Sequence, residues 1–484
     1  MDGATVRGRQ IAVELASDTA PARKPPTTQP RSGGKAAAIV LNKRLISSVT
    51  AGDVLSLFET EGGNFNYVNF ATSLHRLGIL SRSLEKSSRP LLQELVDRAT
   101  SSIINESNEW EARGLANACW GTAKIGNVEA PALFEAIAAE APKKIATFNP
   151  QELANTVWAY ATAGVEAPAL FEAIAAEAPK KIATFNPQDL ANTVWAYATA
   201  GVEAPALFEA IAAEAPKKMA TFNPQNLANT VWAYATAGVE APALFEAIAT
   251  EAPKKIATFK PQNLANTVWA YATAGVEAPA LFVAIAAEAQ KKIAMFTPQA
   301  LANTVWAYAT AGAPALFELI AFRIEAKISE FSPENLSQLH KVYVHLRLES
   351  PQHALTLVLS RHEAALRAAH LREEPTPSQS QRDVSAALSR IGWAHDFEHV
   401  TAEGISLDMA HPASKFAVEF DGPTHYLAGA SGDVSTRALD GKSKSKEQLL
   451  RGLGWKLVRV PYFEWMKLRS SAEREAYLRG KIKT

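Results

Sequence analysis

The sequence predicts an α-solenoid of helical-hairpin repeats with a period of 37–38 residues, followed by a small C-terminal α/β domain. The first observation is the phrase Asn-Pro-Gln-x-Leu-Ala-Asn-Thr-Val-Trp-Ala-Tyr-Ala-Thr-Ala-Gly, which recurs at steps of 37 residues and makes the copies in 149–296 nearly identical. A fixed period of this size is typical of stacked supersecondary units. The second observation is a change of composition near residue 371, where the repeats stop.

The first half of each unit is predicted to be a helix with clear end signals. In the copy that begins at Asn149, this residue is placed as the N-cap, Pro150 as the first helical residue and Glu152 as its capping partner. Gly164 is expected to end the helix, because glycine tolerates a positive φ. The residues between these two ends therefore form the first helix of a hairpin.

The second half of the unit is predicted to be a shorter helix. Pro168 opens it, and the helix is expected to run from Leu170 to Ala178. Pro179 should end or kink this helix, since proline lacks an N–H and clashes with the preceding turn. Each unit is thus an αα-hairpin.

At about 100° per residue, the first helix has two predicted faces. The packing face is expected to hold Leu153, Ala154, Val157, Trp158 and Ala161, whereas the groove-facing stripe is expected to hold Glu152, Asn155 and Ala159, with Thr156 beside it. We interpret the repeated tryptophans as core between repeats rather than as platforms for nucleobases. They are Trp158, Trp195, Trp232, Trp269 and Trp306.

One position differs between copies while its neighbours stay constant. It is occupied by Glu152, Asp189, Asn226, Asn263 and Ala300, and by Asn335 in a diverged unit. Constant asparagines lie three residues further on: Asn155, Asn192, Asn229, Asn266 and Asn303. Carboxylate, amide and methyl groups at one geometric position suit a readout of one base per unit. The alternative is that this position only caps the helix N-terminus, and the sequence leaves both open.

Charge gives a mixed signal about a nucleic-acid partner. The formal net charge is zero, and the copy from Asn149 to Phe185 holds four Glu against two Lys, although counterion release favours basic surfaces. One lysine pair recurs in each unit and can form a basic ladder or a solvated helix end. The pairs in the best-preserved units are Lys180 and Lys181, Lys217 and Lys218, and Lys254 and Lys255.

Four segments are predicted along the chain. Residues 1–60 are expected to be mostly disordered, with a weak targeting signal because acids accompany the basic residues. Residues 61–370 form the array of about eight units, 371–386 a linker and 387–484 the α/β domain. No run of eighteen apolar residues occurs, so no membrane insertion is expected. We expect a monomer.

The C-terminal domain is predicted to alternate helices and strands. A helix around 384–391 precedes strands at 405–409 and 416–421. A basic helix around 442–453 then leads to an apolar strand at 455–460.

Both regions resemble known families. Phe416-Ala-Val-Glu-Phe-Asp-Gly-Pro-Thr-His425, with the downstream Lys442, Leu449-Leu450, Gly454 and Val460-Pro461 to Trp465, resembles the RAP domain, an RNA-binding module with a restriction-endonuclease-like fold. The Pro-Gln-x-Leu-Ala-Asn helix and its period resemble the octotricopeptide repeats of algal organelle proteins. That pairing implies stabilisation, processing or translation of RNA in a chloroplast or mitochondrion.

The nuclease-like fold implied by this resemblance raises the question of catalysis. Asp408, Glu419 and Asp421 could converge on Mg²⁺, with His425 or Lys442 handling protons. Asp421 stands where such nucleases carry lysine, which argues against hydrolysis. Lys442 or Lys444 could replace that lysine in space. The alternative is a fold that only binds RNA, through Lys442, Lys444, Lys446 and Arg451.

The favoured reading is an RNA-binding protein that holds single-stranded RNA along the repeats and contacts RNA-processing or ribosomal proteins. It needs no cofactor. The alternatives are a protein-binding scaffold and an endonuclease, and only the endonuclease would require Mg²⁺.

Overall fold

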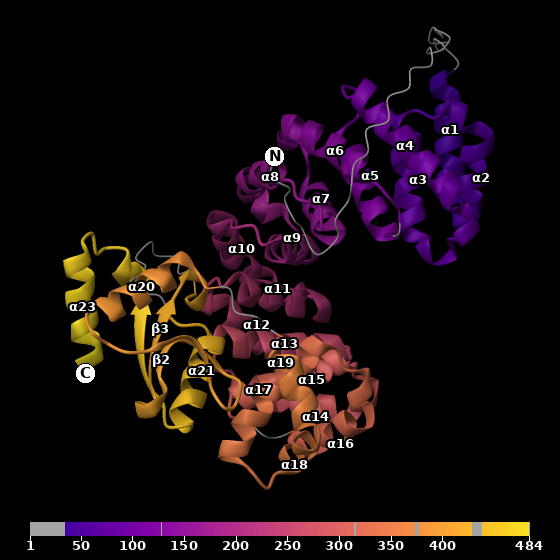
Figure 1. Cartoon of the computed structure of the whole chain (residues 1–484). Coiled ribbons are helices and arrows are strands. Elements are labelled where there is room, and N and C mark those ends of the chain that lie inside the picture. The colour runs from indigo at the N-terminus through magenta and orange to yellow at the C-terminus, as the bar shows by residue number, and fades with distance from the viewer. Residues whose placement is uncertain (1–33, 127, 314–315, 373–376, 428–437, 484) are drawn as a thin grey trace, which may run out of the picture.

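The computed structural model describes residues 34–126, 128–313, 316–372, 377–427 and 438–483. Paired helices stack into a long curved array, and a small α/β domain lies beside its last units (Figure 1). This confirms the predicted fold class. Within the described ranges, no helix is long and apolar enough to cross a membrane.

The array consists of two rows of helices. The first row holds α1 (Gly34–Ser47), α3 (Tyr67–Ile79), α5 (Ala112–Ile125), α7 (Pro150–Ala163), α9 (Pro187–Ala200), α11 (Pro224–Ala237), α13 (Pro261–Ala274), α15 (Pro298–Thr310) and α17 (Pro333–Glu349). The second row holds α2 (Ala51–Glu61), α4 (Arg89–Asn105), α6 (Pro131–Lys144), α8 (Pro168–Lys181), α10 (Pro205–Lys218), α12 (Pro242–Lys255), α14 (Pro279–Lys292), α16 (Phe317–Lys327) and α18 (Ala354–Arg361). The short α19 (Glu363–His370) packs against α17.

The array begins earlier than the sequence predicted. Helices α1 and α2 occupy part of the segment expected to be disordered, and they bury Leu45, Val54 and Phe58 in the same core as the repeats. Their apolar residues have the spacing of a helix, but the alanine and basic residues around them give this segment the composition of a disordered one. The predicted boundary at residue 61 is therefore too late, while residues 1–33 lie outside the described part of the chain.

The predicted end signals of α7 are present. Asn149 and Glu152 form a reciprocal capping box, and Gly164 ends the helix in the left-handed region with φ 66°. The prediction for Pro179 was wrong, because α8 continues through it to Lys181. A proline this close to the end of a helix removes only one backbone hydrogen bond, and the flanking side chains hold the last turn in place.

Each unit is joined to the previous one by a buried tyrosine. The Tyr160 hydroxyl donates to the Phe134 carbonyl at 2.6 Å, and the same bond recurs at Tyr197, Tyr234, Tyr271 and Tyr308 at 2.6–2.7 Å. These hydroxyls are fully paired inside an apolar core. Burial raises the tyrosine pKa values, so the phenols stay neutral donors.

A second joint between units uses one lysine of each pair. Lys218 Nζ lies 3.2 Å from the Glu214 carboxylate and donates to the carbonyls of Ala183 and Phe185 in the preceding unit, each at 2.7 Å. Its neighbour Lys217 contacts only Glu214, and 67% of its side chain is exposed. The two lysines therefore have different roles.

This difference can be tested at one pair. Lys218→Met should lower the free energy of unfolding by about 2 kcal/mol, because two carbonyls and a carboxylate lose a charged donor. Lys217→Met is the matched control and should cost no more than about 0.5 kcal/mol, since its ion pair is exposed. The measurement is urea unfolding followed by circular dichroism. Equal losses for the two variants would contradict the assignment.

The C-terminal domain is built around one mixed sheet. Its elements are α20 (Gln379–Arg390), β1 (Asp396–Val400), β2 (Ser406–His411), β3 (Phe416–Asp421), α21 (Gly441–Gly452), β4 (Lys456–Pro461), α22 (Tyr462–Trp465) and α23 (Ser471–Lys483). The strand order is β1-β2-β3-β4, antiparallel up to β3, with β3 and β4 parallel. The prediction missed β1. It also ended the linker too late, because α20 already packs into the core.

One face of this sheet shares its core with the array. Ile405, Leu407 and Leu450 pack with Val344, which belongs to α17. The His340 ring also hydrogen-bonds the Glu403 carbonyl through Nε2 at 2.7 Å. The domain is thus docked on the last units of the array.

Candidate nucleic-acid interface

A narrow stripe of each first-row helix faces outward. In α7 this stripe contains Gln151, which is exposed, and Asn155 and Trp158, which are half-buried. Their spacing of four and three residues places them on one side of the helix. We call the equivalent positions together the tryptophan face: Arg113, Asn117, Trp120, Gln151, Asn155, Trp158, Gln188, Asn192, Trp195, Gln225, Asn229, Trp232, Gln262, Asn266, Trp269, Gln299, Asn303 and Trp306.

The rings on this face form a continuous ladder. From Trp120 to Trp306, centroids of adjacent indoles are 6.3–6.5 Å apart, and their planes are tilted by 30–40°. The His75 ring extends the ladder at 4.9 Å from Trp120. Lys124 Nζ lies 5.5 Å from the centre of the Trp158 ring, a cation–π distance.

The structure corrects the predicted orientation of the first helices. The tryptophans were expected in the core, but those from Trp120 to Trp269 pack on it with one side and remain half-buried. Ala159 and Thr156 were expected in the groove and are fully buried. Each first-row helix from α5 to α15 contacts two neighbours of its own row and one of the other, so only a narrow stripe stays open. The constant glutamines of that stripe were overlooked, although their invariance across copies was a usable signal.

The variable position is a helix cap. The Asn186 backbone N–H donates to the Asp189 carboxylate at 3.2 Å, and the Lys260 N–H donates to the Asn263 amide oxygen at 3.1 Å. Side chains at this position are at most 9% exposed in the copies with Asp189, Asn226, Asn263 and Ala300. Glu152 and Asn335 are half-buried. At this position Glu152, Asp189 and Asn263 accept capping hydrogen bonds, and Asn226 and Ala300 are buried. The constant asparagines face outward.

The lysine pairs do recur along one edge of the array, but only one lysine of each pair is largely exposed to solvent. Lys180, Lys217 and Lys254 have 61–67% of their side chains exposed, whereas Lys181, Lys218 and Lys255 are 23–25% exposed. Both lysines of a pair contact one buried glutamate, whose pKa they lower by hydrogen bonding. The two lysines and the glutamate of each cluster together therefore carry one net positive charge.

In the C-terminal domain, two of the predicted acidic residues are neighbours across β2 and β3. The Phe420 N–H donates to the Asp408 carboxylate at 2.8 Å, and the Asp408 N–H donates to Glu419 at 3.2 Å. Burial, together with the Glu419 charge, raises the pKa of Asp408 to about 7. Lys446 Nζ donates to Glu419 at 2.5 Å.

The third acidic residue, Asp421, is held by basic groups and is fully buried. Arg459 donates to it at 2.6 Å, and the His425 ring lies 3.3 Å away. Burial alone would raise the pKa of Asp421, but the bond from His425 and the charge of Arg459 outweigh it and lower the pKa. The same bond raises the pKa of His425. The sequence analysis missed Arg459, whose partner becomes evident only when β3 and β4 pair.

The basic residues of α21 separate in space. Lys446 occupies the position beside Glu419 that had been considered for Lys442 or Lys444, so that expectation was wrong. Lys442 Nζ lies 5.3 Å from the centre of the Trp269 ring in the array, and burial of its ammonium lowers its pKa. Arg451 pairs with Glu447 and is 69% exposed.

The carboxylates do not form an open ligand set. Asp421 and Glu419 are both neutralised by basic side chains. Among the described residues, no three His, Cys, Asp or Glu side chains are grouped so that they could hold a metal ion.

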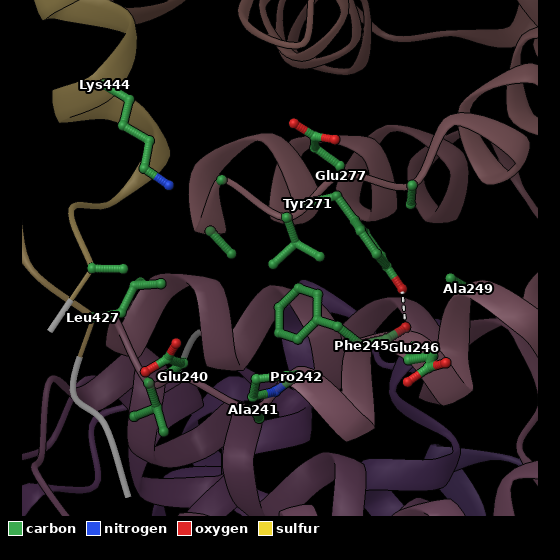
Figure 2. A pocket seen from close by; sticks show the side chains of 16 residues that line it. Glu240, Ala241, Pro242, Phe245, Glu246, Ala249, Tyr271, Glu277, Leu427 and Lys444 are labelled. Carbon is green, nitrogen blue, oxygen red and sulfur yellow. Dashed lines mark hydrogen bonds between the residues drawn. The ribbon is translucent and has the colours of Figure 1, made fainter. Parts of the chain in front are cut away.

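A cavity of about 410 Å³ lies at the junction of the array and the domain (Figure 2). Phe245 and Tyr271 form its apolar floor, and Glu240 and Glu277 lie at its rim. Lys444 reaches it from α21 (Figure 2). Lys444 thus faces the array rather than an independent surface of the domain.

Residues 418–481 match the family model described as RAP domain. The C-terminal unit is a RAP domain. The match includes β3, α21 and β4, which carry Glu419, Lys446 and Arg459. It agrees with the resemblance noted in the sequence.

The repeats and the whole chain have further matches. Residues 103–313 match the model described as RNA-editing substrate-binding complex 6 protein. A "RAP domain-containing protein, chloroplastic" from Oryza sativa subsp. japonica is 27% identical over 158 residues, which are 32% of this chain and 24% of that relative. The chain thus matches about a quarter of that protein's length. These matches are consistent with octotricopeptide-like repeats followed by a RAP domain and with an RNA-associated role.

Proposed function

We propose that this protein binds single-stranded RNA along the tryptophan face and acts in post-transcriptional gene expression in an organelle. The observation that carries the proposal is the ladder of half-buried indoles, each accompanied by an outward asparagine. Indoles provide surfaces for bases, and amides provide donors and acceptors for base edges. The RNA-editing description of the matched repeat family supports the RNA partner, and the chloroplastic relative supports the organellar assignment.

The spacing of the ladder suits an extended strand. Adjacent indoles are 6.3–6.5 Å apart, whereas bases along one strand of a duplex rise by about 3.4 Å. A strand that places one base at each unit must therefore be unstacked, as in repeat proteins that read one base per helical repeat. A duplex does not fit this period, which favours single-stranded RNA.

Charge supports a backbone path along one edge. The exposed lysines Lys180, Lys217 and Lys254 lie at the ends of second-row helices. Their partners Lys181, Lys218 and Lys255 reach the loop just before the first-row helix of the same hairpin. Phosphates on this side would meet the net positive charge of each lysine-lysine-glutamate cluster and the N-terminal ends of first-row helices. We therefore place the RNA backbone on the lysine edge and the bases over the tryptophans.

The face repeats the same chemistry in the units from α7 to α15. Gln, Asn and Trp are constant there, and the position that varies is buried or half-buried near the N-terminal end of the helix. A bound strand therefore meets identical groups at successive bases. We expect a repetitive or weakly discriminated target over these units, protected from nucleases or kept unfolded for other factors. RNA-processing or ribosomal proteins remain proposed partners, and no cofactor is required.

The proposal is tested with a randomised single-stranded RNA pool at two salt concentrations, in which retained RNA is sequenced. The double variant Asn192→Asp/Asn229→Asp adds two negative charges to the face and should weaken binding by about tenfold, or 1.4 kcal/mol. The matched control Asn226→Asp/Asn263→Asp adds the same charge three residues away at the caps. It should change affinity less than twofold.

Binding that is lost equally in both variants would point to charge in general rather than to the tryptophan face. A wild-type protein that retains no RNA would overturn the proposal and favour a protein-binding array. The thermal midpoint of each variant is recorded to confirm that the array remains folded.

A further inference from the structure

Because the repeats are nearly identical, the exposure of one position can be compared between units to show where the tryptophan face is covered. Thr162, Thr199 and Thr236 lie at the same position near the C-terminal ends of α7, α9 and α11, and all three are exposed. The equivalent Thr273 of α13 is 3% exposed. Since the local sequence is the same, the difference must come from the neighbour, which is α21 of the RAP domain.

The contact between α21 and α13 is close and specific. A Cβ atom on Gly441 would lie 1.8 Å from the Ala272 carbonyl oxygen, so only glycine allows this approach. The next residue, Lys442, places its ammonium over Trp269. The indole of Trp269 is therefore occupied by a cation of the chain itself.

The covered region continues to the end of the array. Thr310 of α15, at the position equivalent to Thr273, is half-buried rather than exposed, and Val344 of α17 is part of the core shared with the RAP domain. Trp306 keeps only 9% exposure. Before α13, the equivalent threonines are exposed, and no contact with the RAP domain covers the indoles from Trp120 to Trp232 among the described residues; the cation over Trp158 is Lys124 of the array itself.

We propose that the docked RAP domain ends the RNA-accessible face between Trp232 and Trp269, so that it sets the length of strand the array holds. This inference rests on the proposed function. The open part comprises four indoles, on α5, α7, α9 and α11, and the His75 ring of α3. At one base per unit, about five nucleotides fit. The end of such a strand meets Lys442 and Lys444, whose charges suit its phosphates.

The contact between the RAP domain and the array can be disrupted by a substitution in either partner. Thr273→Gln adds a neutral side chain to a position that is exposed in sibling units, so the helix tolerates it and only the RAP contact is lost. The matched control is Thr236→Gln, the same change in an open unit. Gly441→Leu is the second variant, from the RAP side. Docking is read from the distance between labels on the array at Glu172 and on the RAP domain at Arg451.

The RNA readout uses labelled oligouridylates of 3 to 10 nucleotides. In the wild type and in Thr236→Gln, affinity should stop rising at about five nucleotides. In Thr273→Gln and Gly441→Leu, the label distance should increase and affinity should keep rising to about seven nucleotides, because Trp269 and Trp306 become available.

The outcomes separate the two proposals. A longer label distance with an unchanged plateau would overturn the length limit and leave RNA binding intact. An unchanged label distance in both variants would overturn the docked arrangement. If the protein bound no oligouridylate and also retained no RNA from the randomised pool, the proposed function itself would be overturned.

Discussion

Arg459→Met is expected to unfold the RAP domain at moderate temperature. Asp421 is fully buried, and Arg459 is its closest charged partner, at 2.6 Å. The same guanidinium also holds Glu447 at 2.9 Å and the Ser443 carbonyl at 3.0 Å. Removing one partner of a buried ion pair leaves an uncompensated charge and costs about 3–5 kcal/mol. The measurement is thermal unfolding of the full chain, with near-ultraviolet circular dichroism to follow the tryptophans of the domain.

The control for this prediction is Arg451→Met on the same surface. Arg451 pairs with Glu447 as well, but most of its side chain is in solvent, so its loss should cost less than about 1 kcal/mol. The double variant Arg459→Met/Asp421→Leu removes both charges and should recover part of the lost stability. A stable Arg459→Met protein would show that Asp421 is neutral or solvated in solution.

Asp408→Asn is expected to have the opposite effect and stabilise the RAP domain at pH 8. Burial and the charge of Glu419 raise the pKa of Asp408 to about 7, against an unfolded value near 4. Between these two values the folded state binds more protons than the unfolded state, so its stability falls as pH rises. A shift of this size corresponds to a penalty on the order of 4 kcal/mol above pH 7. Asparagine keeps an acceptor for the Phe420 N–H without this penalty.

The test compares the free energy of unfolding of wild type and Asp408→Asn from pH 4 to pH 8. The difference should be small at pH 4 and grow until about pH 7. Asp396→Asn, at an exposed carboxylate of β1, is the control and should show no such growth. A difference that does not depend on pH would mean that Asp408 ionises normally.

The sequence predicted the parts of this protein that depend on local rules. The Asn149 capping box, the Gly164 helix end and the strand Phe416–Asp421 follow from short-range preferences, and all are present. The helical period also gave the correct architecture. It did not give the correct outward face, because that depends on how many neighbours each helix contacts. The tryptophans were assigned to the core for this reason.

The candidate site was less predictable because its pairs come from distant segments. Lys446 meets Glu419, and Arg459 meets Asp421, only after α21 and β4 pack beside β3. Lys442 was read as a ligand for RNA or a proton carrier, and its position over Trp269 depends on docking between domains. No pattern within a single segment encodes such contacts. The burial of the variable caps could have been anticipated, since every copy keeps a capping residue before the proline except the one with Lys260.

The interfaces between units are interchangeable. From α7 to α13, every joint uses the same tyrosine-to-carbonyl bond and the same lysine bridge, with lengths that agree within 0.1 Å. Loss or gain of one 37-residue segment would therefore rejoin surfaces that already fit, with the first helices and the RAP domain unaltered. Recombination between near-identical gene segments could change the number of units in one step. The array is a structure whose length can evolve without redesign of its parts.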